Sequence, residues 1–170
     1  MTLMTAKRSP EAAGRPRLTP IDRIDSSIFF KLVRVVNLTA RPFVETLSKA
    51  HQLSLNEWRA MVVLASHPGV AAREVAEYTG LDKMSVSRAI AALDHHARIR
   101  KEPDPADARC TRLWLNTAGQ ALFQTIAPLA AERELQLFGG IGTAELQRLG
   151  ETIDRLIDAL QTATAADETA

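Results

Sequence analysis

The chain has 170 residues, a length that suits one folded domain, and its apolar and charged fractions of 46% and 24% are close to globular averages. This composition excludes a collagen-like or wholly disordered chain. No apolar run approaches the roughly 18 residues of a membrane span, and the first twenty residues lack the apolar stretch of a signal peptide. A single cysteine, Cys110, permits no internal disulfide, so we expect a cytoplasmic protein without a membrane.

The net charge of +1 is unevenly distributed along the chain. Residues 1–115 hold 18 Lys or Arg against 12 Asp or Glu, a balance of +6, whereas residues 116–170 hold 3 against 8, a balance of −5. A basic body joined to an acidic end suits contact with an anionic polymer on one side only. Chance unevenness would give the same counts, so the motifs must decide whether the charge distribution reflects binding to an anionic polymer.

The first predicted element follows a basic arm of about eighteen residues that has no periodicity. Thr19 is a capping residue and Pro20 suits a first helical position, which predicts the start of a long helix. Pro42 lacks the N–H that a helix interior needs, so a kink or break is expected near Thr39–Arg41. Apolar residues recur along this helix at spacings of three and four, at Ile21, Ile24, Ile28, Leu32 and Val35.

Capping and stop signals predict three shorter helices next. The first lies between the capping box Ser54-x-x-Glu57 and His67-Pro68-Gly69, the second covers residues 72–79 before Gly80, and the third runs from its N-cap Asp82 to about His96. The last two helices, joined by a three-residue turn, form a helix-turn-helix candidate.

The period then changes from that of helices to that of strands. Residues 99–102 and 110–115 alternate, with a turn-rich tip between them, which predicts a β-hairpin as the only strands of the chain. In its second strand Leu113 and Leu115 are expected to face inward.

Two helices are predicted after the hairpin. Thr117-x-x-Gln120 is a capping box for the first, and Pro128 predicts a bend within it. A glycine-rich break follows at residues 139–142, and Thr143 is expected to cap the last helix. The chain thus divides into an arm, an N-terminal helix, a central lobe, C-terminal helices and a frayed tail, at residues 1–18, 19–50, 51–116, 117–161 and 162–170.

The last helix carries an apolar stripe whose members step by 3, 4, 3 and 4, at Leu146, Leu149, Ile153, Leu156 and Leu160. On a monomer such a stripe would be an exposed sticky face, so a homodimer built on the first and last helices is expected. The stripe could instead cover the core of its own subunit.

The helix that follows Asp82 has a core stripe of Val86, Ile90 and Leu93 and an opposite face that is small and polar around Arg88. Such a helix enters the major groove of B-DNA, where arginine pairs with guanine and serine bonds a base edge or a phosphate. The alternative is an ordinary exposed helix. We expect DNA contacts from this helix and its surroundings, at Arg73, Lys83, Met84, Ser85, Ser87, Arg88, Lys101, Asp107, Arg109 and Arg112.

The hairpin tip strengthens the expectation of DNA binding. Asp107 stands two residues before Arg109, and an arginine held by a carboxylate suits the narrow minor groove, whose negative potential attracts it. The alternative is a solvated turn with incidental charges.

The joined pattern resembles the MarR family of winged helix-turn-helix regulators. The matching segments are LSLNEWRAMVVLASHPGV, REVAEYTGLDKMSVSRAIAALDHHARIRKEPDPADAR and RLWLNTAGQALF. The resemblance, over about residues 21–160, implies a mainly α fold with a small β-hairpin wing, a winged helix-turn-helix dimeric through its N- and C-terminal helices. It implies double-stranded DNA and a second copy of the chain as partners, with no cofactor and no enzymatic activity.

This chain departs from the family pattern at the wing, because its tip holds Arg109 where many members have a second arginine or a more basic tip. Weaker phosphate clamping by the wing is therefore expected. Arg100, Lys101 and Arg112 at the base of the wing, and the basic arm, could supply part of the missing charge.

The resemblance also implies a small effector, often an aromatic acid, in a cavity between the dimer helices and the DNA-binding lobe. A carboxylate needs an arginine or histidine beside apolar walls. The candidates near that junction are Arg34, Arg41, His51, Trp58 and Arg59. Trp58 could equally be a packing residue, and the arginines could be solvated.

Other chemistry has little support in the sequence. Positive charge near Cys110 could lower its pKa, but redox sensors of the resembled family carry their cysteine near the N-terminus, so a packing role is favoured. The histidines form no metal-ligand cluster. An enzyme is not favoured, because the sequence shows neither a phosphate-binding loop nor a nucleophile–base pair. A helical interaction module would leave the hairpin unexplained. The favoured reading is a repressor that binds a pseudo-palindromic operator as a homodimer and is released by an effector.

Overall fold

The computed structural model describes residues 27–107 and 109–167. The basic arm and the helix start expected at Thr19 and Pro20 lie outside the described residues. The first described helix, α1, spans Ile28–Pro42. Ser27 is its N-cap, and the hydroxyl of Ser27 accepts a hydrogen bond from the backbone N–H of Phe30 at 3.4 Å.

The expected irregularity at Pro42 lies after the proline rather than before it. Helix α1 continues to Pro42, and the chain then widens into a five-residue π-helical turn, η2 (Phe43–Leu47), before α2 (Ser48–His51). A π-helical turn accommodates a carbonyl group that the proline leaves without its usual N–H partner. The helix is therefore remodelled without being broken.

The three central helices have the predicted capping interactions. Helix α3 spans Leu55–Ser66, α4 spans Ala72–Thr79, and α5 spans Lys83–His95. Ser54 and Glu57 form the reciprocal capping box that opens α3. Gly80 ends α4 at φ 66°, a left-handed conformation that glycine adopts without steric cost.

The sheet contains one strand more than the sequence predicted. The hairpin consists of β2 (Ile99–Pro103) and β3 (Thr111–Leu115), paired antiparallel with Lys101 opposite Leu113. A two-residue strand, β1 (Val70–Ala71), pairs with the other edge of β3. The prediction that the hairpin holds the only strands was wrong, because two residues are too few to show alternation.

The C-terminal helices differ from the prediction at their ends. The N-cap of α6 (Thr117–Phe138) is Asn116, whose side chain accepts from the N–H of Gly119. The predicted capping box Thr117-x-x-Gln120 was therefore wrong, because the helix begins one residue earlier and Gly119 has no side chain to complete a box. Helix α6 runs without a break through Pro128. Thr143 is the first residue of α7 (Thr143–Asp167) rather than its cap, and the carbonyl of Gly142 accepts the first helical bonds.

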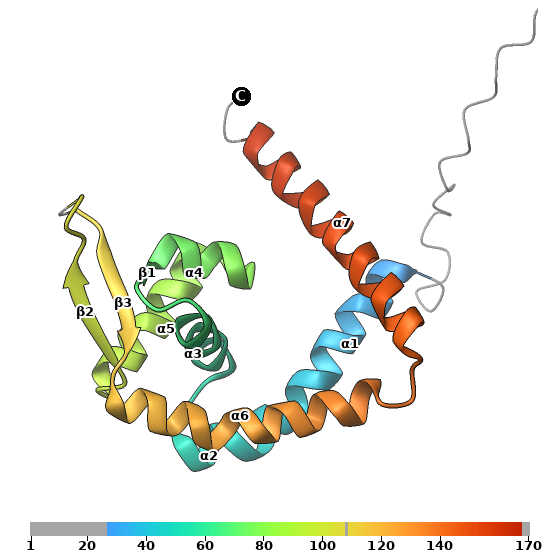
Figure 1. Ribbon diagram of the computed structural model, residues 1–170, viewed down its shortest axis with the longest axis horizontal. Helices are drawn as coiled ribbons and strands as arrows, with labels where there is room; N and C mark the ends of the chain where they lie inside the picture. The colour runs from blue at the N-terminus through green and yellow to red at the C-terminus, as the bar shows by residue number, and fades with distance from the viewer. Residues whose placement is uncertain (1–26, 108, 168–170) are drawn as a thin grey trace, which may run out of the picture.

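The tail predicted to be frayed at 162–170 is helical as far as it is described, since α7 continues through Asp167. Helix α6 connects the central lobe at one end of the molecule to the start of α7 at the other. Helix α1 extends from the lobe toward that far end, and in the view of Figure 1 α7 slants back from it toward the side of the lobe.

The buried core lies almost entirely in the lobe between Leu53 and Leu115. Helices α3, α4 and α5 and the three strands contribute to it, and α6 adds Ile126. On α5 the predicted core stripe of Val86, Ile90 and Leu93 is buried. Burial of these side chains fixes the rotation of α5 and so selects the face that it presents to solvent.

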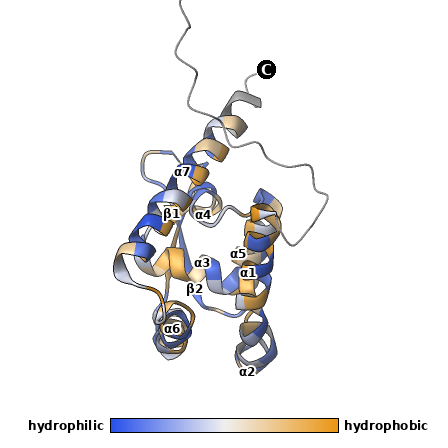
Figure 2. Ribbon diagram, turned by 90° about the vertical axis from the view of Figure 1, so that its right-hand side faces the viewer, coloured by the Kyte–Doolittle hydropathy of each residue, from blue (hydrophilic) through white to orange (hydrophobic). Residues whose placement is uncertain are grey.

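Helices α1 and α7 bury no side chain among those described. Hydrophobic residues recur along both helices among hydrophilic ones (Figure 2). The stripe predicted on α7 does not cover a core in this chain, since Leu149, Ile153 and Leu156 are 41%, 38% and 46% exposed.

Candidate nucleic-acid interface

The N-terminus of α5 is fixed by a double hydrogen bond. The carboxylate of Asp82 accepts from the N–H of Ser85 at 2.9 Å and from its hydroxyl at 2.6 Å. The side-chain bond from Ser85 is the main reason that the pKa of Asp82 lies below its usual value. Because its proton is engaged, the hydroxyl of Ser85 is left as an acceptor for any outside partner.

The exposed face of α5 has the composition that the sequence predicted. Lys83, Met84, Ser87 and Arg88 are exposed, and Met84 is the most prominent apolar side chain among them, at 63% exposure. A methionine between polar residues gives the helix a surface that suits both thymine methyls and polar base edges.

On one side of α5 a groove separates the helix from the wing. It consists of two adjoining cavities of about 370 and 430 Å³, both lined by Ala72, Arg73, Ile90 and Lys101. The cavity nearer the wing adds Arg109 and Cys110, and the one nearer the N-terminus of α5 adds Lys83, Ser87 and others. Five of the expected DNA contacts therefore line this groove: Arg73, Lys83, Ser87, Lys101 and Arg109.

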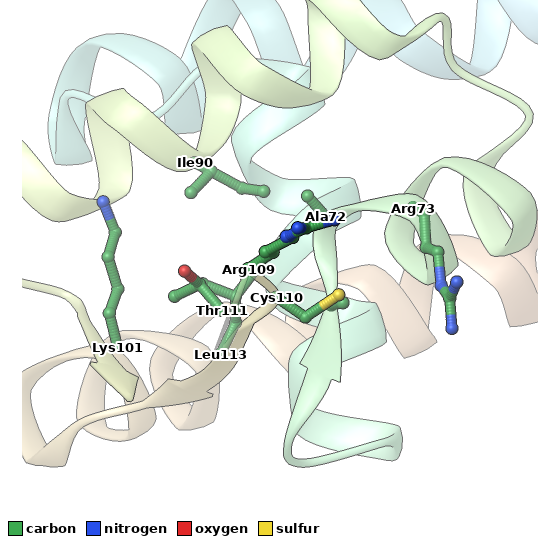
Figure 3. A pocket seen from close by; sticks show the side chains of 9 residues that line it. Ala72, Arg73, Ile90, Lys101, Arg109, Cys110, Thr111 and Leu113 are labelled. Atoms are coloured by element: carbon green, nitrogen blue, oxygen red, sulfur yellow. The ribbon is translucent and has the colours of Figure 1, made fainter. Parts of the chain in front are cut away.

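The side chains of the groove do not all point the same way (Figure 3). Arg109 reaches across the groove toward Ala72, beneath Ile90, whereas Arg73 extends away from these residues. The wing arginine therefore lies against its own lobe in this structure rather than extending beyond the tip.

On the other side of α5, Ser85 and Arg88 line a cavity of about 300 Å³ with the start of α3, including Ser54 and Asn56. Arg88 and Arg109 therefore lie on opposite flanks of the helix. The sequence grouped them in one set, and the structure separates them into two surfaces.

Asp107 organises the wing tip through the backbone. Its carboxylate accepts from the N–H of Arg109 at 3.0 Å and from the thiol of Cys110 at 3.4 Å. Among the described residues no ion pair joins Asp107 to the guanidinium of Arg109. Asp107 therefore stabilises the turn that carries Arg109 through its backbone and forms no ion pair with its guanidinium.

This contact also reverses the expected direction of the cysteine pKa. The hydrogen bond to Asp107, followed by desolvation, raises the pKa of Cys110 above its usual value, and the nearby Arg73 offsets only part of this rise. The thiol is thus less acidic than the neighbouring arginines suggested.

The guanidinium of Arg112 is engaged by contacts within the chain, although its side chain remains 33% exposed. Its guanidinium donates to Asp104 at 2.7 Å, and to Glu74 and the carbonyl of Gly69 at 3.2 Å each. These contacts join the wing to α4 and to the β1 turn. A bond from the N–H of Ala106 and the Arg112 contact hold the pKa of Asp104 below its usual value.

The other cations at the wing base are also paired. Lys101 contacts Asp94 at 2.7 Å, and Arg100 pairs with Glu102 while its guanidinium lies 4.4 Å from the ring centre of Trp114. These cations at the base of the wing were expected to supply part of the positive charge that the wing tip lacks. Because each of them already has a carboxylate partner, less of their charge is available to DNA phosphates.

The five effector candidates do not converge on one cavity. Arg34 and Arg41 are exposed on α1, and Arg59 donates to Asn56. The ring of Trp58 stacks between Phe43 and Phe123, with centroids 6.2 and 5.4 Å away. His51 contributes its carbonyl to a bond from Arg98. The cavities beside α5 and beside the sheet are lined by other residues.

Sequence reasoning missed Arg98, which lies between α5 and the wing. Its guanidinium donates to the carbonyls of His51 and Gln52 at 2.5 and 2.9 Å and lies 3.6 Å from Glu57. In the sequence Arg98 is one of several cations in a charged stretch with Arg100 and Lys101, so nothing local singles it out, and its partners are more than forty residues away in the chain.

In the part of the chain that the structure describes, no three His, Cys, Asp or Glu side chains gather as a metal site would require. No described helix is both long and apolar enough to cross a bilayer.

Residues 51–109 match the model of the MarR family. These residues are the lobe that carries α5 and most of the wing. The lobe belongs to the MarR family. This family match points to a transcriptional regulator rather than an enzyme.

Individual MarR-type proteins are similar over most of the chain. The transcriptional regulator HosA of Escherichia coli O111:H- is 21% identical over 107 residues, which cover 63% of this chain and 79% of HosA. A crystal structure of a MarR/EmrR family regulator from Acinetobacter sp. ADP1 has a TM-score of 0.75 and 24% identity, covering 82% of this chain and 99% of that one.

A third relative is described together with a small molecule. BpsR of Bordetella bronchiseptica, whose DNA binding is described as regulated by 6-hydroxynicotinic acid, has a TM-score of 0.70 and 21% identity, covering 80% of this chain and 96% of that one. The TM-scores show that the chain shares the winged helix fold of these regulators.

Proposed function

We propose that this MarR-type chain is a homodimeric repressor that reads a pseudo-palindromic operator with α5. The observation that carries the proposal is the exposed face of α5, where Met84, Ser87 and Arg88 project from a helix whose opposite side is locked into the core. Two such helices related by a two-fold axis would read half-sites about one turn of DNA apart.

The two flanks of α5 would perform different tasks. Arg88, on the flank away from the wing, is the candidate for direct pairing with a guanine edge. Arg73, Lys83 and Arg109 line the groove toward the wing, where they would contact phosphates and the adjacent minor groove. Because Arg112 is held by Asp104 and Glu74, its role would be to support the wing.

The experiment is fluorescence anisotropy on duplexes tiled across the upstream region of the gene, at two salt concentrations. Tight binding to one palindromic duplex that weakens as salt rises supports operator reading. Arg88→Ala should cost about 1–3 kcal/mol at one base position, whereas Arg109→Ala should weaken binding to all sequences more evenly. Arg133→Ala, on exposed α6, is the control.

Equal and weak binding to every duplex would contradict operator reading. If Arg88→Ala bound the selected duplex as well as the unchanged protein does, α5 would not be the reading helix. A helical interaction module, the second candidate, would then account better for the apolar stripe of α7.

The proposed effector is a small aromatic acid that acts where the lobe meets the first helix. The regulation ascribed to BpsR supports the ligand class, and the stack of Phe43, Trp58 and Phe123 joins η2, α3 and α6 at that junction. An acid bound there would change operator binding by favouring one dimer geometry. Titration of aromatic acids into the protein–operator complex tests this, and release that persists in Trp58→Ala would contradict the location.

A further inference from the structure

We propose that Arg98 is a positioning residue that sets the angle between the DNA-reading lobe and the helices on either side of it. This positioning role goes beyond operator binding. Only its expected effect on DNA binding rests on the proposed function. Arg98 lies in the short turn between α5 and β2, so it is attached directly to the reading helix and to the wing.

The side chain of Arg98 connects this turn to the end of the N-terminal helices. It donates to the carbonyls of His51 and Gln52, at the C-terminal end of α2, and it is only 12% exposed. An arginine that satisfies two carbonyls at a helix end also complements the negative end of the helix dipole. Its planar group holds both acceptors in one geometry, which a flexible ammonium group cannot do.

A buried carboxylate gives this contact a second anchor. Glu57 is 7% exposed, and its Oε2 atom has no hydrogen-bond partner in the described structure, although Arg98 lies 3.6 Å away. The other oxygen of Glu57 accepts from Ser54 at the start of α3. Arg98 therefore supplies the positive charge nearest to a carboxylate that would otherwise be buried without compensation.

The backbone of the same turn is attached to α6. Asn116, the N-cap of α6, donates to the carbonyls of Ala97 and Ile99, and its own N–H donates to the carbonyl of Arg98. Gly119 faces that carbonyl so closely that an added Cβ would lie 2.0 Å from it. The first turn of α6 is therefore fitted against the backbone of Arg98.

Two strained residues flank these contacts. Gln52 and Ala97 have φ angles of 48° and 51°, and they are the described non-glycine residues with positive φ. Such a conformation costs energy and persists where surrounding contacts enforce it. Here both strained residues lie beside bonds that Arg98 or Asn116 makes to their carbonyls.

The first helix has few other means of holding its angle. No residue of α1 is buried, and beyond it Phe43 of η2 stacks on Trp58. Figure 1 shows α1 extending away from the lobe toward the far end of α6. A small change in angle where the N-terminal helices meet the lobe would move the far end of α1 by a larger distance. In a dimer held by α1 and α7, the Arg98 contact would therefore control the distance between the two α5 helices.

Arg98→Met is the main test, because methionine retains much of the side-chain length but none of the donors. Arg133→Met removes the same charge from an exposed position on α6 and is the matched control. Arg98→Lys keeps a charge near Glu57 without the planar group. The double variant Arg98→Met with Glu57→Gln leaves no uncompensated charge if the single variant fails to fold.

The first measurement needs neither DNA nor a known ligand. Spin labels are placed at Lys31→Cys on α1 and Glu77→Cys on α4, both exposed, in a Cys110→Ser background, and labelled chains are diluted into unlabelled ones. We expect Arg98→Met to broaden or shift the distance distribution between the labels, with Arg98→Lys intermediate and Arg133→Met unchanged. A distribution unchanged in the folded Arg98 variants, including the double variant, overturns the proposal.

The second measurement compares the operator with duplexes whose half-sites are moved apart by one or two base pairs, and with a single half-site. Arg98→Met should lower the preference for the native spacing about tenfold while leaving the half-site affinity unchanged. Loss of half-site affinity with the spacing preference retained would indicate a merely structural role and would overturn the proposal. If the unchanged protein bound no operator, the proposed function would fail, and the label distances would still decide the role of Arg98.

Discussion

The central lobe and the helices α1 and α7 carry similar apolar side chains and place them differently. In the lobe, Met61, Leu64 and Leu93 are at most 1% exposed, whereas on the outer helices Val35 and Leu156 are 51% and 46% exposed. The lobe therefore holds a complete hydrophobic core within one chain. The outer helices have apolar faces that none of the described residues covers, which is the pattern of an interface.

The comparison predicts stability effects of different size for the same substitution in the two regions. Leu93→Ala should lower the free energy of unfolding by about 2–5 kcal/mol, because it leaves a cavity in a closed core. Leu156→Ala should cost less than about 0.5 kcal/mol at protein concentrations too low for association, and more as the concentration rises. Urea titrations at several concentrations measure both.

Equal losses for the two leucine variants at low concentration would show that α7 packs on its own chain. A Leu156→Ala effect that is independent of concentration would likewise remove the reason for proposing that α7 associates.

A charge within the exposed stripe should separate association from folding. Leu156→Asp should raise the dissociation constant of the proposed dimer about a hundredfold, because a carboxylate would be buried without a partner. Thr162→Asp adds the same charge on the opposite side of α7, where the wheel spacing places it away from the stripe. Sedimentation equilibrium measures the constants, and an unchanged dimer in Leu156→Asp would place the interface elsewhere.

Local signals were enough to predict most of the lobe. Ser54 and Glu57, Gly80 and Asp82 each set a helix end through contacts within four residues of themselves, so their partners lie close by in the sequence. The apolar period of α5 likewise identified its core face. Where one cap competes with another, as Asn116 does with Thr117, the choice depends on tertiary contacts with the α5–β2 turn.

Distant pairings could not be predicted from the sequence. Arg112 looked available for DNA, but folding brings Glu74 and Asp104 to its guanidinium. Arg98 drew no attention because His51 and Gln52 approach it only in the folded chain. The expected DNA contacts were a single set in the sequence, and only the packing of α5 assigns them to two flanks.

Backbone strain offers a smaller test of how firmly the lobe is held together. Gly80→Ala places a side chain in open space at φ 66°, so its cost of about 1 kcal/mol would be conformational alone. Ala97→Gly should have the opposite sign and raise the free energy of unfolding by about 0.5–1 kcal/mol, since glycine relieves a φ of 51°. Thermal or urea unfolding of both variants measures the sign of each change in unfolding free energy. Destabilisation by Ala97→Gly would mean that no strain is stored in the turn that contains Ala97 and Arg98.

Like the outer helices, the wing tip has no buried apolar side chains among those described, and polar contacts alone hold it in place. The bond from the Cys110 thiol to Asp107 raises the pKa of the thiol, so at a given pH a smaller fraction is thiolate. Alkylation by iodoacetamide at pH 8 should therefore be slower than for an unfolded peptide of the same sequence. Asp107→Asn removes the charge and should speed the reaction, and Asp104→Asn should do so less, since Asp104 is the weaker influence on the thiol. A rate unchanged by Asp107→Asn would show that the tip is not held by this contact in solution, and Arg109 would then be free to leave the groove without breaking it.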